Sequence, residues 1–454
     1  MRSLKISVSG VRGIVGVSLT NSVAMEFGKA FSTFVNCGRI VIARDTRTSG
    51  DMLKGAVMAG VLSSGCGVID IGVVPTPTAL FYVRKHREDG GIIVTASHNP
   101  GEWNGLKFAE KDGTFLSEER LDKFFDIYYK KEFRVVPWDS LKSVKEDYSA
   151  ANAHIDEVLN YLDVKAIRKK HFKVGVDFVN GTGFAVTPRF LSELGCGMVA
   201  INNEPTGLFN HEPEPLPKNL KGLCRLVRQK RMDIGFAQDP DADRLAVISE
   251  KGVPVGEELT LALAVKFILL YREKGPVVTN LSASQVLDNI TRAFKVKLIR
   301  TKVGESNVVC EMKKKRAIIG GEGNGGVIFP KINYGRDSLV GMGLILEYLA
   351  KSNKKISQIA NELPRYEMIK GKFECPFSKT ADVLENIKLA YKNEKKDTLD
   401  GVKVRWADKW VHIRSSNTEP IIRVIAEAKT KKEADSLYQA VSKKIEDVVA
   451  QRVS

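Results

Sequence analysis

The sequence predicts an α/β protein with three related α/β domains and a C-terminal α+β domain. Three segments repeat one plan, in which a β-branched strand ends in Asp or Asn and is followed by a helix and a second apolar strand. After about residue 370 this repeat stops, and short strands alternate with two helices. The chain of 454 residues has room for three or four domains of about 100–150 residues each.

The three repeats occupy residues 38–72, 172–202 and 276–304, and the last is the loosest copy. The first two also share a Gly-Cys-Gly before their second strand. Because successive strands joined by a helix pair in parallel, each repeat predicts a parallel strand pair within its own domain.

The C-terminal pattern is different. Residues 368–376 read as a strand, residues 380–393 as an amphipathic helix, residues 402–428 as three strands, and residues 431–453 as a final helix. These patterns place the domains at residues 1–150, 151–255, 256–370 and 371–454.

Composition and charge exclude several classes of protein. The net charge is +16, but the basic clusters are scattered without interleaved aromatic residues. This favours solvated faces, or attraction of small anionic substrates, over nucleic-acid binding. The best apolar stretch, residues 259–271, is too short to span a membrane. The N-terminus shows no apolar signal region, and the six cysteines form no CxxC pair. We therefore expect a cytoplasmic protein that contacts neither membranes nor nucleic acid.

A first candidate loop follows the apolar run of residues 92–94, in the stretch "TASHNPGEWNGLKF". In open α/β sheets ligands bind beyond the carboxyl ends of strands, so Ser97 is either a polar strand end or a serine placed for chemistry. A Ser97–His98 hydrolase pair is disfavoured, because adjacent side chains usually point apart and a base must reach the hydroxyl in space.

A second loop, "QDPDADR", alternates Asp239, Asp241 and Asp243 along an extended segment. Three converging carboxylates would repel one another unless a divalent cation neutralised them, and hard oxygen ligands favour Mg²⁺. An EF-hand is disfavoured because Arg244 stands where the calcium loop needs Gly. An acidic surface turn is the remaining alternative.

Two further loops carry polar side chains. The first, "GGEGNGGV", has five glycines in residues 320–327 together with Glu322 and Asn324, which suit sugar hydroxyls. The second is "RSSNTEPIIR", whose hydroxyls, amide and arginines match the oxygens of a phosphate. Its candidate residues are Arg414, Ser416, Asn417, Thr418 and Arg423. A plain turn is the alternative for each loop.

The order and content of these four loops resemble the α-D-phosphohexomutase superfamily, which includes phosphoglucomutase, phosphomannomutase and phosphoglucosamine mutase. The resemblance covers essentially the whole chain, and "TASHNP" and "DPDADR" are its most specific motifs. It implies four domains around a central cleft and a phosphosugar substrate.

The resemblance also implies roles for individual residues. Ser97 would carry a phosphoryl group, and one of its phosphate oxygens would bind Mg²⁺ together with Asp239, Asp241 and Asp243. Arg12, Lys107 and Arg244 match basic residues that line the family's cleft. The implied substrate-binding residues are Arg12, His98, Glu322, Asn324, Arg414, Ser416, Asn417, Thr418 and Arg423.

The implied reaction moves a phosphoryl group between O6 and O1 of a sugar through a 1,6-bisphosphate, which also serves as the activator. Many relatives end the sugar loop in Ser-Gly-His, whereas this chain has Gly326 in the position of the His. Lys107 is therefore the favoured general acid/base, and Arg244 is the weaker candidate because a guanidinium hardly deprotonates.

The substrate and two other classes of function stay open. "Thr-Glu-Pro" at residues 418–420 favours glucosamine 6-phosphate and glucosamine 1-phosphate, with a phosphomannomutase/phosphoglucomutase of broad specificity as the alternative. A metal-dependent sugar phosphatase and a non-catalytic sugar-phosphate-binding protein would use the same loops. The sequence does not fix the oligomeric state.

Overall fold

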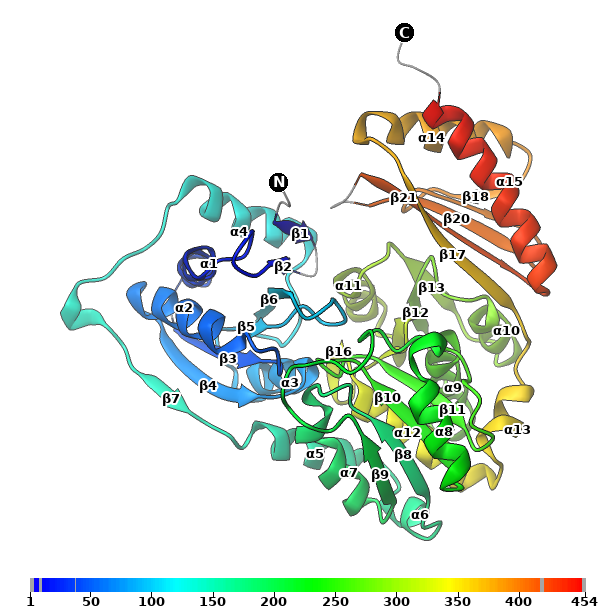
Figure 1. The fold of residues 1–454 in the computed structure, drawn as a ribbon, viewed down its shortest axis with the longest axis horizontal. Helices are drawn as coiled ribbons and strands as arrows, with labels where there is room; N and C mark the ends of the chain where they lie inside the picture. The colour runs from blue at the N-terminus through cyan, green and yellow to red at the C-terminus, as the bar shows by residue number, and fades with distance from the viewer. Residues whose placement is uncertain (1–3, 8–9, 37, 417–419, 451–454) are drawn as a thin grey trace.

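The structure is a computed structural model that describes residues 4–7, 10–36, 38–416 and 420–450. Its strands form four sheets, one for each part of the predicted pattern (Figure 1). The predicted fold class, three α/β units followed by an α+β unit, is confirmed. No helix within the described ranges is long and apolar enough to cross a membrane.

The first sheet is mixed and has the strand order β1-β2-β6-β5-β3-β4-β7. Its strands are β1 (Lys5–Ser7), β2 (Gly10–Ile14), β3 (Arg39–Arg44), β4 (Gly67–Val73), β5 (Gly90–Val94), β6 (Trp103–Glu110) and β7 (Val144–Glu146). Its helices are α1 (Asn21–Phe34), α2 (Gly50–Ser63), α3 (Thr76–His86) and α4 (Glu118–Lys130), and η1 (Trp138–Ser140) precedes β7.

Successive side chains of β3 pack against helices on opposite faces of this sheet. Ile40 and Ile42 join the apolar core beneath α1, α2 and α4, whereas Val41 and Ala43 join the core beneath α3. Successive side chains of a strand point to opposite faces, so both faces of β3 are buried. The strand is therefore central, and the loop that follows it lies at the carboxyl edge of the sheet.

The second sheet has the order β11-β10-β8-β9, and its β10 and β11 form an antiparallel hairpin. Its strands are β8 (Lys173–Asp177), β9 (Gly197–Ile201), β10 (Ile234–Gln238) and β11 (Leu245–Ser249). Its helices are α5 (Ala150–Tyr161), α6 (Val164–Arg168), η2 (Thr182–Ala185), α7 (Thr187–Glu193), η3 (Pro217–Asn219) and α8 (Lys221–Gln229).

The third sheet has the order β13-β12-β14-β15-β16. Its strands are β12 (Val277–Asn280), β13 (Leu298–Thr301), β14 (Ile319–Glu322), β15 (Gly326–Phe329) and β16 (Asn333–Arg336). Its helices are α9 (Glu257–Tyr271), α10 (Val286–Ala293), α11 (Glu305–Lys315), α12 (Ser338–Ser352) and α13 (Ile356–Asn361). One apolar core joins the second and third sheets, so these two units pack as a block.

The parallel pairs predicted from the three repeats are confirmed as β3 with β4, β8 with β9, and β12 with β13. Each repeat is extended by strands that pair antiparallel, namely β6, β11 and β15. These antiparallel strands follow the loops predicted to carry chemistry, so each of those loops is the turn of a hairpin.

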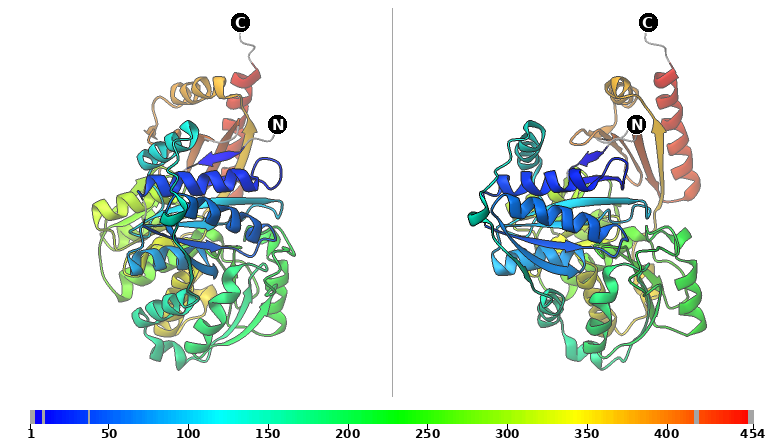
Figure 2. Two further views of the ribbon diagram at one scale, coloured as in Figure 1. Left: turned by 90° about the vertical axis from the view of Figure 1, so that its left-hand side faces the viewer. Right: turned by 60° about the vertical axis from the view of Figure 1, so that its left-hand side comes forward.

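The fourth sheet is entirely antiparallel, in the order β17-β21-β20-β19-β18. Its strands are β17 (Glu367–Glu374), β18 (Lys395–Asp397), β19 (Val402–Arg405), β20 (Trp410–Ser415) and β21 (Ile421–Ala428). Helices α14 (Phe377–Ala390) and α15 (Lys431–Ala450) pack together against it. The predicted helix over residues 380–393 thus begins and ends three residues earlier, and β17 leads into this unit from the third (Figures 1 and 2).

Candidate active site

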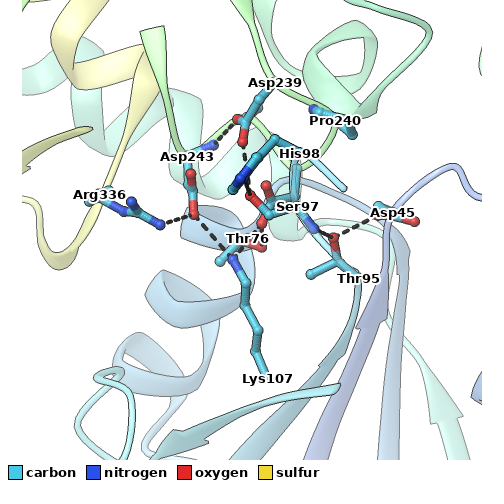
Figure 3. A network of polar contacts seen from close by, with 12 residues as sticks. Asp45, Thr76, Thr95, Ser97, His98, Lys107, Asp239, Pro240, Asp243 and Arg336 are labelled. Carbon is cyan, nitrogen blue, oxygen red and sulfur yellow. Dashed lines mark hydrogen bonds and ion pairs between the residues drawn. The ribbon is translucent and has the colours of Figure 1, made fainter. Parts of the chain in front are cut away.

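Ser97 lies in the loop after β5, two residues after Thr95 begins that loop, and it is almost completely buried. Its backbone is left-handed, with φ of 52°, a conformation that is uncommon outside glycine. Its Oγ donates a hydrogen bond of 3.0 Å to Asp239 Oδ2, across from the first sheet to the second (Figure 3). The structure therefore directs the Ser97 hydroxyl at the predicted metal loop.

The metal loop is the turn of the β10–β11 hairpin, residues 239–244. The carboxylates of Asp239, Asp241 and Asp243 are buried, and one oxygen from each lies within 4.8 Å of the others. The backbone N–H groups of Asp243 and Arg244 both donate to Asp239 Oδ1, at 3.1 Å each. The turn itself therefore holds the Asp239 carboxylate, whereas Asp241 Oδ2 accepts hydrogen bonds from Thr76 and Lys107 of the first unit.

Two buried cations contact these carboxylates. Lys107 Nζ, from β6, lies 2.6 Å from Asp241 Oδ2 and 3.1 Å from Asp243 Oδ2. Arg336, at the end of β16, donates to Asp243 Oδ2 at 2.6 Å (Figure 3). Burial alone would lower the pKa of Lys107, but Asp241 and Asp243 raise it above its ordinary value. Lys107 is therefore a charged ammonium here.

Lys107 and Arg336 do not occupy all the oxygens of the three carboxylates, so oxygens remain that could bind a metal ion. Among the described residues, Asp241 Oδ1 and Asp243 Oδ1 are buried and have no hydrogen-bond partner. Burial raises the pKa of Asp239 well above its ordinary value, and the charges of Asp243 and Asp241 add to this effect. A buried anion without a partner is costly, so the three residues fit a hard divalent cation such as Mg²⁺.

The glycine-rich loop of residues 320–327, which we predicted to bind a sugar and call the sugar loop, contains the turn between β14 and β15. It packs against the metal loop. Leu245 N, directly after the metal loop, donates to Gly325 O at 3.1 Å. Glu322 accepts hydrogen bonds from Arg336 (3.1 Å) and Asn280 (2.9 Å). Asn324 Oδ1 accepts from Gly326 N at 3.3 Å. Arg336 therefore joins the sugar loop to the metal loop through its two terminal guanidinium nitrogens.

His98 contradicts one prediction. Its Nδ1 lies 3.3 Å from Ser97 Oγ, so these adjacent side chains do meet. The left-handed backbone of Ser97 turns its side chain toward that of its neighbour. The prediction that the pair points apart is wrong for this loop. Burial lowers the pKa of His98 well below its ordinary value, and the charges of Arg244 and Arg12 lower it further.

The predicted cationic residues of the first two units also gather here. Arg12, in β2, donates to Asn99 Oδ1 at 2.9 Å, directly beside His98. Arg244 pairs with Glu214 at 3.2 Å, and its Nε lies 4.0 Å from Asp239 Oδ2. Both arginines therefore border the Ser97 loop.

The loop of the fourth unit lies between β20 and β21, where Arg414 and Arg423 are opposite one another in the sheet. Arg414 pairs with Asp400 at 3.6 Å. Burial lowers the pKa of Arg414, whereas Asp400 and Glu322 act to raise it. Glu322 is thus near enough to act electrostatically on Arg414. Ser416 is buried, and the predicted Asn417 and Thr418 lie outside the described residues.

Sequence reasoning missed four residues of this network: Thr76, Glu214, Glu305 and Arg336. Thr76 donates to Asp241 at 2.6 Å, and Glu305 accepts from Arg336 at 3.0 Å. None of the four belongs to a loop motif. Thr76 and Arg336 reach the metal loop from other units, whereas Glu214 and Glu305 pair with Arg244 and Arg336 of their own units. The "YGRD" at residues 334–337 ends a strand, which is the only local signal that pointed to Arg336.

Models of one protein family match four successive parts of the chain. Models of the phosphoglucomutase/phosphomannomutase α/β/α domains I, II and III match residues 3–135, 152–252 and 256–366, and the model of the C-terminal domain of that family matches residues 372–444.

Two relatives align over nearly the whole chain. A "Phosphoglucomutase/phosphomannomutase" of Thermococcus kodakarensis is 39% identical, over 97% of this chain and 98% of the relative. A "Probable phosphoglucosamine mutase" of Methanopyrus kandleri is 35% identical over the same shares. The crystal structure of a phosphoglucomutase/phosphomannomutase family protein from Burkholderia thailandensis superposes with a TM-score of 0.85, at 25% identity and 98% coverage of both chains.

Proposed function

Because the chain belongs to the phosphoglucomutase/phosphomannomutase family, and is therefore an isomerase of the phosphohexomutase type, we propose that Ser97 is its phosphoryl carrier. The observation that supports this most directly is the 3.0 Å hydrogen bond from Ser97 Oγ to Asp239, within the carboxylate triad. A hydroxyl that is buried, directed at a metal site and bordered by cations suits phosphoryl transfer, in which positioning and electrostatics dominate.

In the proposed reaction, a free hydroxyl of a hexose or hexosamine monophosphate attacks the phosphorus of phosphoserine 97. A bond forms between the sugar oxygen and phosphorus, and the bond between phosphorus and Ser97 Oγ breaks. The sugar hydroxyl loses its proton, and Ser97 Oγ regains one. The resulting 1,6-bisphosphate then returns its other phosphoryl group to Ser97, so that phosphate has moved between O6 and O1.

Asp239, Asp241 and Asp243 would hold the Mg²⁺ ion, with an oxygen of the phosphoserine as a further ligand. When bound, the ion supplies positive charge that offsets the negative charge on the transferring phosphoryl group. Lys107 and Arg336 contact the same carboxylates, so they supply charge from the protein beside the reacting phosphorus.

We propose Lys107 for the proton transfer as well. Its Nζ is buried and lies within hydrogen-bond reach of Asp241 and Asp243. As a charged ammonium it would give a proton to Ser97 Oγ as the bond to phosphorus breaks, and would take up the proton that the sugar hydroxyl loses. The alternative role is electrostatic only. Arg244 is the weaker candidate, since a guanidinium hardly deprotonates.

Arg12, His98, Glu322, Asn324, Arg414, Ser416, Asn417, Thr418 and Arg423 are proposed to bind the substrate. Glu322 and Asn324 would face sugar hydroxyls, and the loop of the fourth unit would hold the phosphate that is not reacting. The electrostatic effect of Glu322 on Arg414 supports a site shared by these two loops.

Glucosamine 6-phosphate and glucosamine 1-phosphate are the favoured pair of substrates. Residues 418–420, Thr-Glu-Pro, and the absence of Ser-Gly-His from the sugar loop support this choice, as does the name of the Methanopyrus kandleri relative. The name of the Thermococcus kodakarensis relative supports the alternative, a phosphomannomutase/phosphoglucomutase with broad specificity. We place the enzyme in the cytoplasm and expect a hexose 1,6-bisphosphate to activate it by phosphorylating Ser97.

A combined experiment tests this proposal. The protein is incubated with glucose 1,6-bisphosphate and Mg²⁺, and peptide mapping by mass spectrometry locates the phosphate. Specificity constants are then measured on glucosamine, glucose and mannose phosphates. We expect phosphate on Ser97, loss of turnover in Ser97→Ala, and the highest specificity constant for glucosamine phosphate. Phosphate at another residue would overturn the role of Ser97, and a higher constant for a neutral sugar would reverse the substrate ranking.

The same experiment separates the other functions. A phosphatase would release inorganic phosphate instead of retaining a bisphosphate, and a binding protein would bind the sugar phosphate without any turnover.

A further inference from the structure

Arg47 is a buried arginine whose guanidinium is fully occupied by hydrogen bonds. An arginine side chain has five N–H donors. Here Nε donates to Asp45 Oδ2 at 3.1 Å. The other four bonds go to main-chain carbonyl oxygens of the Ser97 loop, those of Ser97 (2.7 Å), Asn99 (2.6 Å), Pro100 (2.7 Å) and Trp103 (2.9 Å). Arg47 is therefore an internal support for that loop.

Asp45 is connected to the backbone N–H of Ser97, whereas Arg47 binds its backbone C=O. We call Asp45, Arg47 and Thr95 the Arg47 cluster. Asp45 Oδ2 accepts a hydrogen bond of 2.6 Å from Thr95 Oγ1, and Thr95 Oγ1 in turn accepts one of 2.9 Å from Ser97 N (Figure 3). The backbone N–H of Ser97 is thus connected to Asp45 through Thr95, and its C=O is connected to Asp45 through Arg47. The backbone N–H and C=O of Ser97 are thus both linked, each through one side chain, to the buried carboxylate of Asp45.

Sheet topology explains why residues 45–47 meet residues 95–103. Strands β3 and β5 are parallel neighbours, with Arg44 opposite Val94. The carboxyl ends of parallel strands lie at the same edge of a sheet, so the segment that follows β3 lies directly beside the loop that follows β5.

The Arg47 cluster and the adjacent Thr46 also reach the unit that carries the metal loop. Thr46 Oγ1 donates to Asn180 O at 2.7 Å, and the ring of Phe209 lies 4.9 Å from the Arg47 guanidinium carbon. Asn180 follows β8, which pairs with β10, the strand that leads into Asp239. The segment after β3 therefore contacts Ser97 directly and also contacts the unit that carries Asp239.

We propose that Arg47 is a positioning residue for the phosphoryl carrier. It contacts Ser97 through the main-chain oxygen of that residue and not through the hydroxyl that would carry the phosphoryl group, and it acts by holding Ser97 in the left-handed conformation that aims Oγ at Asp239. Uncommon backbone conformations persist where the surrounding structure determines them, and five hydrogen bonds from one side chain provide that determination. This inference rests on the proposed function, because it takes Ser97 as the group that reacts.

The first variant is Arg47→Lys, which keeps the positive charge but has three donors on a single nitrogen. It leaves several buried carbonyls of the loop unpaired. We expect kcat to fall roughly 10- to 100-fold, the size of effect that a displacement of about 1 Å produces, while KM stays near that of the parent. The rate at which glucose 1,6-bisphosphate phosphorylates Ser97, followed by intact-protein mass spectrometry, should fall by the same factor.

The second variant is Thr95→Val, which removes only the link from Asp45 to Ser97 N. It should show the same selective loss of kcat with a smaller loss of thermal stability, and it decides the question if Arg47→Lys does not fold. A variant that folds and retains the parental kcat and phosphorylation rate overturns the positioning role.

Arg300→Lys is the matched control. Arg300, whose side chain is 8% exposed, donates to the main-chain oxygens of Asn280 at the end of β12 and of Ala283 and Ser284 in the loop that follows. The control should lose a comparable amount of thermal stability without the specific loss in Ser97 phosphorylation. An equal loss of phosphorylation in Arg300→Lys would show that Arg47 acts only on overall stability, and would overturn the inference.

Amide hydrogen exchange separates failure of this inference from failure of the proposed function. Peptides covering residues 96–103 should exchange faster in Arg47→Lys than in the parent, and should be unchanged in Arg300→Lys. Unchanged exchange in Arg47→Lys overturns the inference. A parent protein that never acquires phosphate on Ser97 instead overturns the proposed function, and the exchange data still decide whether Arg47 holds the loop.

Discussion

At the scale of single residues, the carboxylate triad concentrates charge that the fold alone does not need. We expect Asp239→Asn to weaken Mg²⁺ binding by at least about 10- to 100-fold, the loss typical of changing a residue one layer outside a metal site. Thermal stability without metal should not fall, because the change removes one of three negative charges packed within 4.8 Å. Isothermal titration calorimetry with Mg²⁺ and thermal unfolding in chelator measure both effects.

The control for that change is Asp70→Asn. Asp70 is a buried carboxylate in the first sheet that pairs with Lys54 at 2.6 Å, away from the triad. It should lose stability and retain the parental Mg²⁺ affinity. Parental affinity in Asp239→Asn would contradict the assignment of the metal site.

Lys107 has two separable roles, as a charge and as a source of protons. Lys107→Met should slow phosphoryl transfer by roughly 10²- to 10⁴-fold, because it removes both the ammonium beside Asp241 and its exchangeable protons. Lys107→Arg keeps the charge alone. Single-turnover kinetics of Ser97 phosphorylation measure the two rates, and an Arg variant nearly as fast as the parent would limit Lys107 to electrostatics. Lys54→Met is the matched control for loss of a lysine–aspartate pair.

At the scale of elements, the long loop of residues 202–216 brings a second unit to the site. It carries Phe209, which lies over Arg47, and Glu214, which pairs with Arg244. His211 ties this loop to Asp177 at the end of β8, through a 3.1 Å contact from Nε2. His211 is therefore one of several attachments of this loop to the sheet, beside the hydrogen bond of 2.7 Å from Asn180 Nδ2 to Leu208 O.

The attachment should depend on pH. Burial would lower the pKa of His211, but the hydrogen bond and charge of Asp177 raise it above its ordinary value, as does the carbonyl of Glu212. A histidine whose pKa is raised by folding stabilises the fold fully below its ordinary pKa of about 6.5, and this contribution is lost as the pH rises through the raised value.

We therefore expect the parent to exceed His211→Gln in melting temperature by more at pH 5.5 than at pH 8.5. Thermal unfolding of both proteins in the same buffers checks the difference, and a gap that widens with rising pH would have the wrong sign.

At the scale of the whole molecule, the site draws cations from three units, namely Arg12 and Lys107 from the first, Arg244 from the second and Arg336 from the third. The net charge of +16 has the same sign. Because exposed electrostatic attraction is screened by salt, raising the ionic strength from 0.05 to 0.3 M should lower kcat/KM for a dianionic sugar phosphate by roughly tenfold. Steady-state kinetics should place this loss in KM, and an equal fall in kcat would contradict it.

Local sequence patterns predicted the features that depend on residues close together in the chain. The three strand–helix–strand repeats and the positions of the Ser97 and Asp239–Asp243 loops follow from spacing and strand ends. The extended segment expected for residues 239–243 is wrong, because these residues form the turn of a hairpin. The order of strands within each sheet does not, because antiparallel partners such as β6 and β11 are placed by packing.

The supporting residues of the site could not be predicted either, because packing between distant segments brings them to it. Arg336 is 93 positions from Asp243, and Arg47 is 50 positions from Ser97. A single arginine after a strand has no pattern that distinguishes it from a solvated one, and its partners are backbone carbonyls or carboxylates on another element. The pairing of Ser97 with His98 was missed for a different reason, since a left-handed residue is not visible in the sequence.

The φ of 52° at Ser97 also restricts which amino acid evolution can place there. Serine and threonine are exchanged freely at many positions, since both offer a hydroxyl and differ by one methyl group. In left-handed backbone, however, a β-branched side chain is a genuine outlier, and its χ1 freedom is already restricted. A relative with threonine at this position would still have a hydroxyl group. Its backbone would disfavour the left-handed conformation that directs the hydroxyl at Asp239.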